Sequence, residues 1–296
     1  SFLEVPGFRA RLDLQAATEY LTFQNMFSDR TLFADVRTLP AGSMMIMEGD
    51  HTPRMTRWWQ PHFEANEDRG EAWYLAGVRE RFEEAVRRQL MGDVPVGSYL
   101  SGGMDSGSIT AIAARQIPHL HTFTGGFPVA GMSGSEAMTD ERTAAEFMAR
   151  TMGTEHYTVV VQPHDLPRLL PELVWHLEDL RVASSYHNYA VARLASRFVK
   201  VVLAGAGGDE IFAGYPWRYA HAAGTTSLDD FATRYADYWS ILVPDSEKSG
   251  LFVGDLARDA RGFHAAERVR EVVSDLRSEE HTSEPVTATS RMPSSA

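Results

Sequence analysis

The chain has 296 residues, a formal net charge of −12, 44% apolar and 23% charged residues, and no cysteine. This composition is typical of a globular protein with one large domain, or a domain plus part of another. It excludes disulfides, thiolate zinc sites and a cysteine nucleophile within the sequence, and the acidic balance argues against nucleic acid as a partner. No apolar run approaches the roughly 20 residues that span a bilayer, and no signal-peptide pattern opens the chain, so we expect a cytoplasmic protein without a membrane partner.

Residues 1–60 differ in pattern from the rest of the chain. A short helical pattern covers Asp13–Phe23, and a Leu39-Pro-Ala-Gly turn precedes a methionine-rich strand at Met44–Met47. A segment rich in Pro, His and Trp follows at 51–62 and is typical of a linker. We therefore expect residues 1–60 to be the end of another domain with its linker, and a second domain to cover 61–276.

A four-residue apolar period begins after Glu71 and predicts a long amphipathic helix. Its apolar face comprises Tyr74, Val78, Phe82, Val86 and Leu90, while Arg and Glu occupy the other positions. We expect this helix to cover a core.

Four apolar strand candidates then alternate with helical stretches. The strands are expected at Val94–Leu100, Leu120–Thr124, His156–Val161 and Val199–Ala204, and the helices at Ser106–Gln116, Asp140–Met152, Leu166–Leu177 and Tyr186–Phe198. Such alternation predicts an α/β fold with a parallel sheet and helices on both faces. Ligands of such sheets bind at the carboxyl ends of the strands.

The end of the chain carries weaker signals. A helical pattern continues after Tyr219, and we expect Lys248, in a Ser-Glu-Lys-Ser setting, to lie in a surface loop. Residues 277–296 contain almost no core-forming side chains and resemble translated sequencing adapter, so we expect them to be a disordered tail of artefactual origin.

The motif Ser-Gly-Gly-Met-Asp-Ser at 101–106 stands where a predicted strand turns into a helix. Gly102 and Gly103 lack a Cβ, so the backbone can bend and bring N–H groups against a ligand. The following helix N-terminus favours an anion such as phosphate, and Ser101 and Ser106 add hydroxyl donors. The remaining alternative is an ordinary turn in which Asp105 only caps the helix.

A carboxylate beside phosphate requires a cation between them, so Asp105 indicates Mg²⁺. A second loop repeats the architecture: Gly205, Gly207 and Gly208 follow an apolar strand and precede Asp209 and Glu210. Because both loops leave the same edge of a parallel sheet, we expect Asp105 and Asp209 to share the metal. The alternative is that the second acidic pair only complements the helix dipole.

The two motifs, in this order and spacing, resemble the synthetase domain of the glutamine-hydrolysing asparagine synthetases. Phe123-Thr-Gly-Gly-Phe and Trp175-His-Leu-Glu-Asp are similar to further segments of that family, and the residues from Thr31 to Gly42 resemble the end of its N-terminal glutaminase domain. The resemblance extends to about Leu276. It implies the adenine-nucleotide α-hydrolase, or ATP pyrophosphatase, fold.

The same resemblance implies a two-step reaction. The carboxylate of aspartate attacks ATP to give an acyl-adenylate and pyrophosphate, and ammonia, free or derived from glutamine, then displaces AMP. ATP and Mg²⁺ are thus the implied cofactors, and the full-length protein can be a homodimer. Loop donors and Mg²⁺ would stabilise the charge of the leaving pyrophosphate.

The resemblance also assigns site residues position by position. It implies that ATP and its pyrophosphate are bound by Tyr99, Leu100, Ser101, Gly102, Gly103, Asp105, Ser106, Gly125, Ala204 and Gly205. Asp105 and Asp209 correspond to the magnesium ligands. Backbone atoms can make several of these contacts, so side-chain identity carries little weight at Tyr99, Gly125, Ala204 and Gly205.

Three departures from the family pattern concern chemistry. Ala206 stands where many members have an acidic residue, the family's catalytic lysine would lie beyond Leu276, and the cysteine that releases ammonia from glutamine is absent. We therefore expect nucleotide binding with poor or no synthetase activity.

Other functions remain open. β-Lactam-forming and peptide-cyclising relatives share both loops, and a nucleotide-binding module without chemistry would fit Ala206. The pair Glu178-Asp179 can contact a substrate ammonium group or be an exposed helix end. We expect the scattered histidines to be packing or surface residues and not metal ligands.

Overall fold

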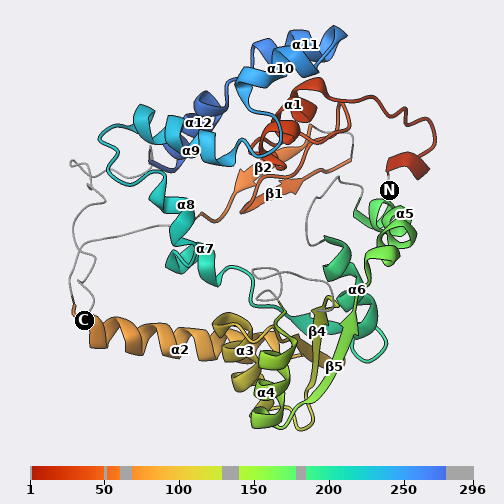
Figure 1. The fold of residues 1–296 in the computed structure, drawn as a ribbon, viewed down its shortest axis with the longest axis vertical. Helices are drawn as coiled ribbons and strands as arrows, with labels where there is room; N and C mark the ends of the chain where they lie inside the picture. Colours follow the sequence, from red (N-terminus) through yellow and green to blue (C-terminus); the bar gives the residue numbers. More distant parts are fainter. Residues whose placement is uncertain (1, 50–51, 61–68, 129–139, 178–184, 278–296) are drawn as a thin grey trace. The chain divides into compact units, whose positions relative to one another are not determined.

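The computed structural model describes residues 2–49, 52–60, 69–128, 140–177 and 185–277, and these fall into two compact units. Unit 1 comprises Ser1–Phe63 and Tyr215–Ala296, and unit 2 comprises Glu64–Gly214. Figure 1 shows the elements of both units. Each unit is described by itself.

Unit 2 contains a parallel sheet of four strands in the order β5-β4-β3-β6. The strands are β3 (Val96–Tyr99), β4 (His121–Gly126), β5 (Glu155–Val160) and β6 (Val201–Leu203). In the central register, Ser98 of β3 pairs with Thr122 of β4 on one side and with Leu203 of β6 on the other. The predicted α/β fold with a parallel sheet is confirmed.

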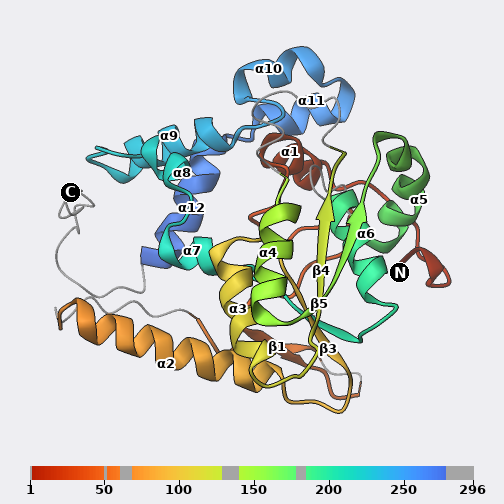
Figure 2. The ribbon, with the colours of Figure 1, turned by 60° about the horizontal axis from the view of Figure 1, so that its bottom comes forward.

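Helices cover both faces of this sheet. They are α3 (Met104–Ala114) and α4 (Arg142–Met152) on one face, and α5 (Leu166–Leu177) and α6 (Ser185–Ala195) on the other, as Figure 2 shows. The short helices η3 (Pro163–Asp165) and α7 (Gly208–Phe212) complete the described part of unit 2 together with α2 (Glu71–Gln89). Phe123 and Leu100, each 1% exposed, lie in the cores on the two faces.

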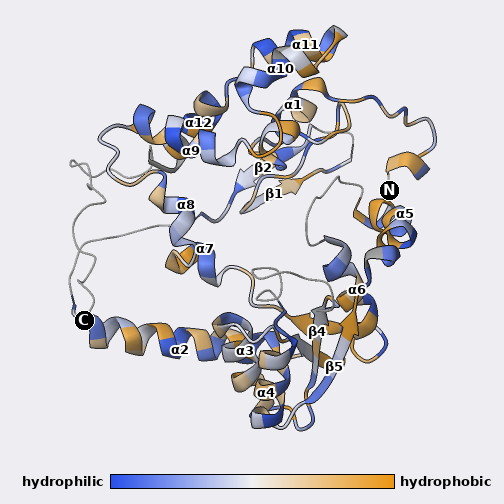
Figure 3. Cartoon of the chain, viewed as in Figure 1, coloured by the Kyte–Doolittle hydropathy of each residue, from blue (hydrophilic) through white to orange (hydrophobic). Residues whose placement is uncertain are grey.

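The long helix α2 forms as predicted but buries less of its apolar face than expected. Val86 is 5% exposed and packs with Ala113 and Leu120, whereas Tyr74, Val78 and Phe82 are 36–45% exposed. Apolar and polar segments alternate along the helix in Figure 3. The apolar period and ion pairs within the helix, such as Arg79–Glu83, favour the helical conformation. Burial of the apolar face requires in addition another element that packs against it. The expectation that this helix covers a core is confirmed around Val86, whereas the apolar face from Tyr74 to Phe82 is more exposed.

Unit 1 combines elements from both ends of the described chain. These elements are η1 (Phe2–Glu4), α1 (Leu14–Phe23), the antiparallel strands β1 (Ser43–Ile46) and β2 (Arg54–Arg57), and the helices α8 (Pro216–Ala220), α9 (Leu228–Trp239), α10 (Asp245–Leu251), α11 (Gly254–Arg261) and α12 (Ala265–Arg277). The core places Phe23 of α1 against Ala232 and Ala236 of α9 and Val269 of α12. The predicted helix and methionine-rich strand near the beginning of the chain are confirmed.

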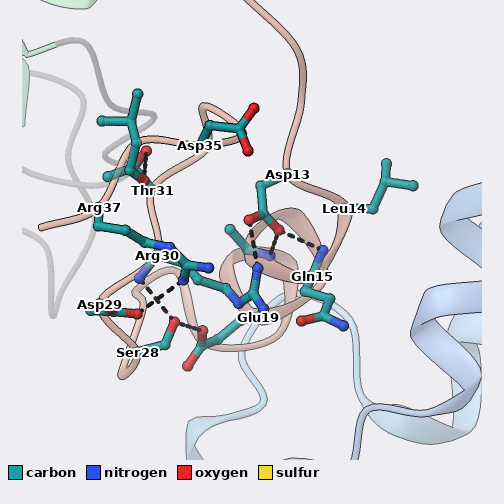
Figure 4. A network of polar contacts seen from close by, with 12 residues as sticks. Asp13, Leu14, Gln15, Glu19, Ser28, Asp29, Arg30, Thr31, Asp35 and Arg37 are labelled. Carbon is teal, nitrogen blue, oxygen red and sulfur yellow. Dashed lines mark hydrogen bonds and ion pairs between the residues drawn. The ribbon is translucent and has the colours of Figure 1, made fainter.

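Polar contacts fix the start of α1. Asp13 caps the helix by accepting hydrogen bonds from the backbone N–H groups of Gln15 and Ala16, both at 3.0 Å. Its carboxylate also pairs with Arg30 at 2.7 Å, and Figure 4 shows the two side chains facing one another. The cap satisfies N–H groups that the first helical turn leaves without intrahelical acceptors.

These contacts group the residues differently from the expected domains 1–60 and 61–276. Residues from Tyr215 onward share a unit with 1–63, because α1 packs against α11 and because Phe23 lies among residues of α9 and α12. The assignment of 61–276 to one family domain remains a prediction. Most of the predicted tail, residues 278–296, lies outside the described residues.

Lys248 requires a correction. It belongs to α10, is 3% exposed and forms an ion pair with Asp245, so the expectation of a surface loop was wrong. The polar local sequence did not reveal Phe263, whose ring lies 4.3 Å from Nζ and helps to cover it. Within the described part of the chain, no helix has the length and apolar character needed to cross a bilayer.

Candidate functional site

The motif at 101–106 lies at the carboxyl end of β3, in unit 2. Gly102 has a φ of +86°, and a Cβ there would lie 2.6 Å from the Cβ of Ala144, so both backbone conformation and space require glycine. Gly103 has a φ of −73° and precedes the first residue of α3. The helix begins at Met104, two residues earlier than predicted, and Asp105 therefore lies in its first turn.

Hydroxyl groups brace this loop from within. The Oγ atoms of Ser101 and Ser106 lie 2.9 Å apart, and the Ser106 hydroxyl also accepts a hydrogen bond from the Ser101 N–H. The N–H of Gly103 donates to Ser101 Oγ at 3.2 Å. Both serines therefore hold the loop in a turn that leads directly into the N-terminus of an eleven-residue helix, a favourable position for an anion.

The second loop lies directly against the first. A Cβ at Gly205 would be 2.8 Å from the backbone nitrogen of Ser106, and a Cβ at Gly208 would be 2.6 Å from the carboxyl carbon of Asp105. Glycine at both positions thus allows the backbone after β6 to approach the Asp105 carboxylate. The predicted meeting of the two loops at one edge of the sheet is seen in the structure.

Asp209 follows Gly208 in the first turn of α7. Its carboxylate lies against Gly214, where a Cβ would strike Asp209 Oδ1, whereas the Asp105 carboxylate lies against Gly208. Mg²⁺ commonly takes one or two carboxylates plus phosphate oxygens and water. The described residues contain no group of three or more His, Cys, Asp or Glu side chains suited to a metal.

The end of β4 adjoins the same loop. The N–H of Leu100 donates to the carbonyl of Phe123 at 3.0 Å, and the Thr124 hydroxyl donates to the carbonyl of Leu100. Gly125 follows in β4, where a Cβ would lie 2.6 Å from Cε1 of His187 and closer still to its Nε2. The carboxyl ends of β3 and β4 are thus held together beside the loop at 101–106.

Three further predicted contacts differ in their side-chain environment. Tyr99 packs with the cluster around Phe123, and burial raises the pKa of its phenol above the ordinary value. Leu100 is buried against Ala145 under the loop, whereas Ala204 is exposed. At Leu100 only backbone atoms can contact a ligand, because the side chain is 1% exposed.

The sequence did not indicate two side chains at this edge. His187 of α6 stacks on Phe127 with ring centroids 4.9 Å apart, and its Nε2 is buried without a hydrogen-bond partner in the described part of the chain. Arg142 of α4 donates to the carbonyl of Phe127 and pairs with Asp140 at 2.7 Å. The sequence does not show that either residue lies at this edge, because their contact with Phe127 joins separate parts of the chain. Glu178-Asp179 lies outside the described residues.

A family model and individual relatives of this chain all point to the same family. The family model described as asparagine synthase matches residues 77–293. A Mycobacterium tuberculosis protein assigned as a glutamine-hydrolysing asparagine synthetase is 35% identical over 218 residues, which are 72% of this chain and 32% of that protein. Asparagine synthetase (glutamine-hydrolysing) 1 of Bacillus subtilis is 33% identical over 69% of this chain and 31% of its own length.

The match covers only part of these relatives. The chain spans about a third of the length of the curated relatives that it matches. A solved NMN synthetase from Francisella tularensis covers 74% of this chain at 14% identity with a TM-score of 0.32, a level of likeness that carries no argument about function.

Proposed function

This chain belongs to the asparagine synthase family, and we propose that its unit 2 binds ATP, with the pyrophosphate held by the loop at 101–106. The backbone N–H groups at the start of α3 would donate to phosphate oxygens. Gly102 provides the turn that brings those groups to the ligand, and Ser101 and Ser106 keep the turn in place.

The observation that carries this proposal is the close approach of Gly205 and Gly208 to Asp105. Two glycine loops from adjacent parallel strands meet around one carboxylate at the edge where ligands of such sheets bind. Asp105 and Asp209 are the proposed ligands of Mg²⁺, which would neutralise charge on the phosphates.

We further propose that the whole protein adenylates the carboxylate of aspartate. A carboxylate is a poor electrophile, so an oxygen of the substrate carboxylate attacks the α-phosphorus of ATP and the bond to the bridging oxygen of pyrophosphate breaks. Ammonia then attacks the acyl carbon, AMP leaves, and asparagine forms. The part of this chain would be to orient ATP and to stabilise the departing pyrophosphate through the α3 N-terminus.

Ala206 favours a second candidate function. Its methyl group is exposed in the loop after β6, at a position where many family members carry an acidic side chain. A chain without that carboxylate can bind nucleotide without completing the reaction, or can act on a different carboxylic acid, as β-lactam-forming and peptide-cyclising relatives do.

Titration of ATP with and without Mg²⁺ tests the nucleotide site. We expect Asp105→Asn to abolish the magnesium-dependent gain in ATP affinity while far-UV circular dichroism stays unchanged. Asp93→Asn is the matched control, because Asp93 is exposed in unit 2 before β3. Equal magnesium dependence in all three proteins would rule out the proposed metal ligand.

Product analysis tests the chemistry separately. With ATP, Mg²⁺, ammonia and aspartate, the proposal predicts equal amounts of AMP, pyrophosphate and asparagine. Nucleotide binding without AMP formation for aspartate or any other tested acid would instead support the binding module.

A further inference from the structure

A cavity of about 200 Å³ lies in unit 1. Residues of α10, α11 and the turn before α12 line it: Asp245, Lys248, Ala257, Ala260, Arg261, Phe263 and His264. One carboxylate therefore shares the cavity with a lysine, an arginine and a histidine.

Lys248 is the most buried of these charged groups. It is 3% exposed, its Nζ lies 2.5 Å from Oδ1 of Asp245, and the ring centroid of Phe263 is 4.3 Å away. An ammonium group has three N–H donors. Asp245 is its only hydrogen-bond acceptor among the residues that the structure describes, so the ammonium can donate further hydrogen bonds inside the cavity.

Asp245 cannot serve the other cationic groups as well. Its second oxygen, Oδ2, accepts a hydrogen bond from the N–H of Ala265 at 2.9 Å, at the start of α12. In the described ranges, neither Arg261 nor His264 has a side-chain hydrogen bond or an ion pair. The cavity thus carries more positive than negative charge in a chain whose net charge is −12.

We propose that this cavity binds a small oxyanion, a carboxylate or a phosphate, which accepts hydrogen bonds from Lys248 and Arg261. Burial of an ammonium is costly unless its donors are satisfied, and an anion would satisfy them better than neutral water does. The volume corresponds to about seven water molecules in the liquid, which is enough for such a ligand. Arg261 and His264 are exposed and give the ligand access from solvent.

The lysine content of the chain allows a residue-specific test. Lys200 and Lys248 are the only lysines in the sequence, and Lys200 is an exposed residue of unit 2. The full chain labelled with ¹³C at lysine Cε would be titrated with sodium phosphate, and in a second arm with sodium acetate, at constant ionic strength. We expect a saturable shift of the Lys248 signal with at least one anion, while Lys200 stays in place.

Two arginines of α11 provide the matched variants. Arg261 lines the cavity, whereas Arg258 pairs with Asp255 outside its lining and is 73% exposed. Loss of one charge-assisted hydrogen bond predicts about tenfold weaker binding, or more, in Arg261→Gln and no change in Arg258→Gln. Both arginines are exposed, so both variants should fold.

Two results would contradict the proposal that this cavity binds an oxyanion. One is a Lys248 signal that responds to neither phosphate nor acetate. The other is an affinity that is the same in Arg261→Gln and in the unaltered chain. Asp105→Asn, which probes the nucleotide site, should leave the Lys248 titration unchanged.

Discussion

The imidazole of His187 lies directly over the backbone of Gly125, in the space that a side chain at position 125 would occupy. Val191, one turn further along α6, closes the same space, since its Cγ2 would be 2.6 Å from a Cβ at Gly125. Glycine in β4 therefore permits α6 to pack against the sheet at the edge of the proposed nucleotide site.

Gly125→Ala should destabilise unit 2, because the new methyl group displaces His187 and Val191. Overpacking of this kind costs about 1–3 kcal/mol in the free energy of unfolding, measured by urea denaturation. Gly92→Ala is the control: a Cβ there meets no atom within 4 Å, so we expect a change within about 0.5 kcal/mol. The double variant Gly125→Ala/His187→Ala should recover part of the loss. If the double variant loses the sum of both single effects, the packing explanation fails.

Gly102→Ala should reduce both stability and ATP affinity. Its φ of +86° strains any other residue by roughly 1–2 kcal/mol, and the methyl group would also strike Ala144. Gly103→Ala changes the neighbouring residue, whose φ of −73° suits alanine and whose nearest contact would be Ser101 Oγ at 3.2 Å. We expect the second variant to fold almost normally. Equal losses in the two variants would contradict the assigned role of Gly102.

Glu19→Gln should destabilise unit 1. Glu19 is 3% exposed and accepts hydrogen bonds from the Phe27 N–H, the Ser28 hydroxyl and Arg268. Loss of the charge weakens several charge-assisted bonds, so we expect about 1.5–3 kcal/mol less free energy of unfolding. Glu271→Gln tests the exposed partner of the same arginine, and there we expect less than about 1 kcal/mol. A larger loss in the free energy of unfolding in Glu271→Gln than in Glu19→Gln would contradict the burial argument.

The pH dependence of stability should carry a contribution from His156. Burial lowers the pKa of its imidazole, and Thr122 lies 2.9 Å from Nδ1. Because the folded-state pKa is below the unfolded value of about 6.5, this contribution is fully present above pH 6.5. It is lost as the pH falls from there through the folded-state pKa, because the unfolded chain binds the proton first.

Urea denaturation from pH 7.5 to 5 measures this contribution. His156→Asn should flatten the decline in the free energy of unfolding, whereas His164→Asn, at an exposed residue of η3, should leave the slope unchanged. An unchanged slope in His156→Asn would show that other groups cause the decline.

The sequence predicted those parts of the fold that depend on neighbouring residues. The strands before both glycine loops, the helix at α3 and the bend of the backbone at Gly102 and Gly103 follow from local pattern and steric rules. The contact of His187 with Gly125 and the burial of Lys248 by Phe263 do not, because each joins elements whose packing no local pattern reports. For the same reason the exposed half of α2 was not foreseen.

The ion pair between Glu19 and Arg268 joins residues 249 positions apart in the sequence. During synthesis at about 5–20 residues per second, roughly 10–50 s would pass before α12 is available to α1. Until then Phe23 would lack its partners from α12, among them Val269. All residues of unit 2 have been synthesised once the chain reaches residue 214. Its sheet can therefore form before α9 and α12 are available to α1. The order of translation therefore allows unit 2 to fold before unit 1 is complete.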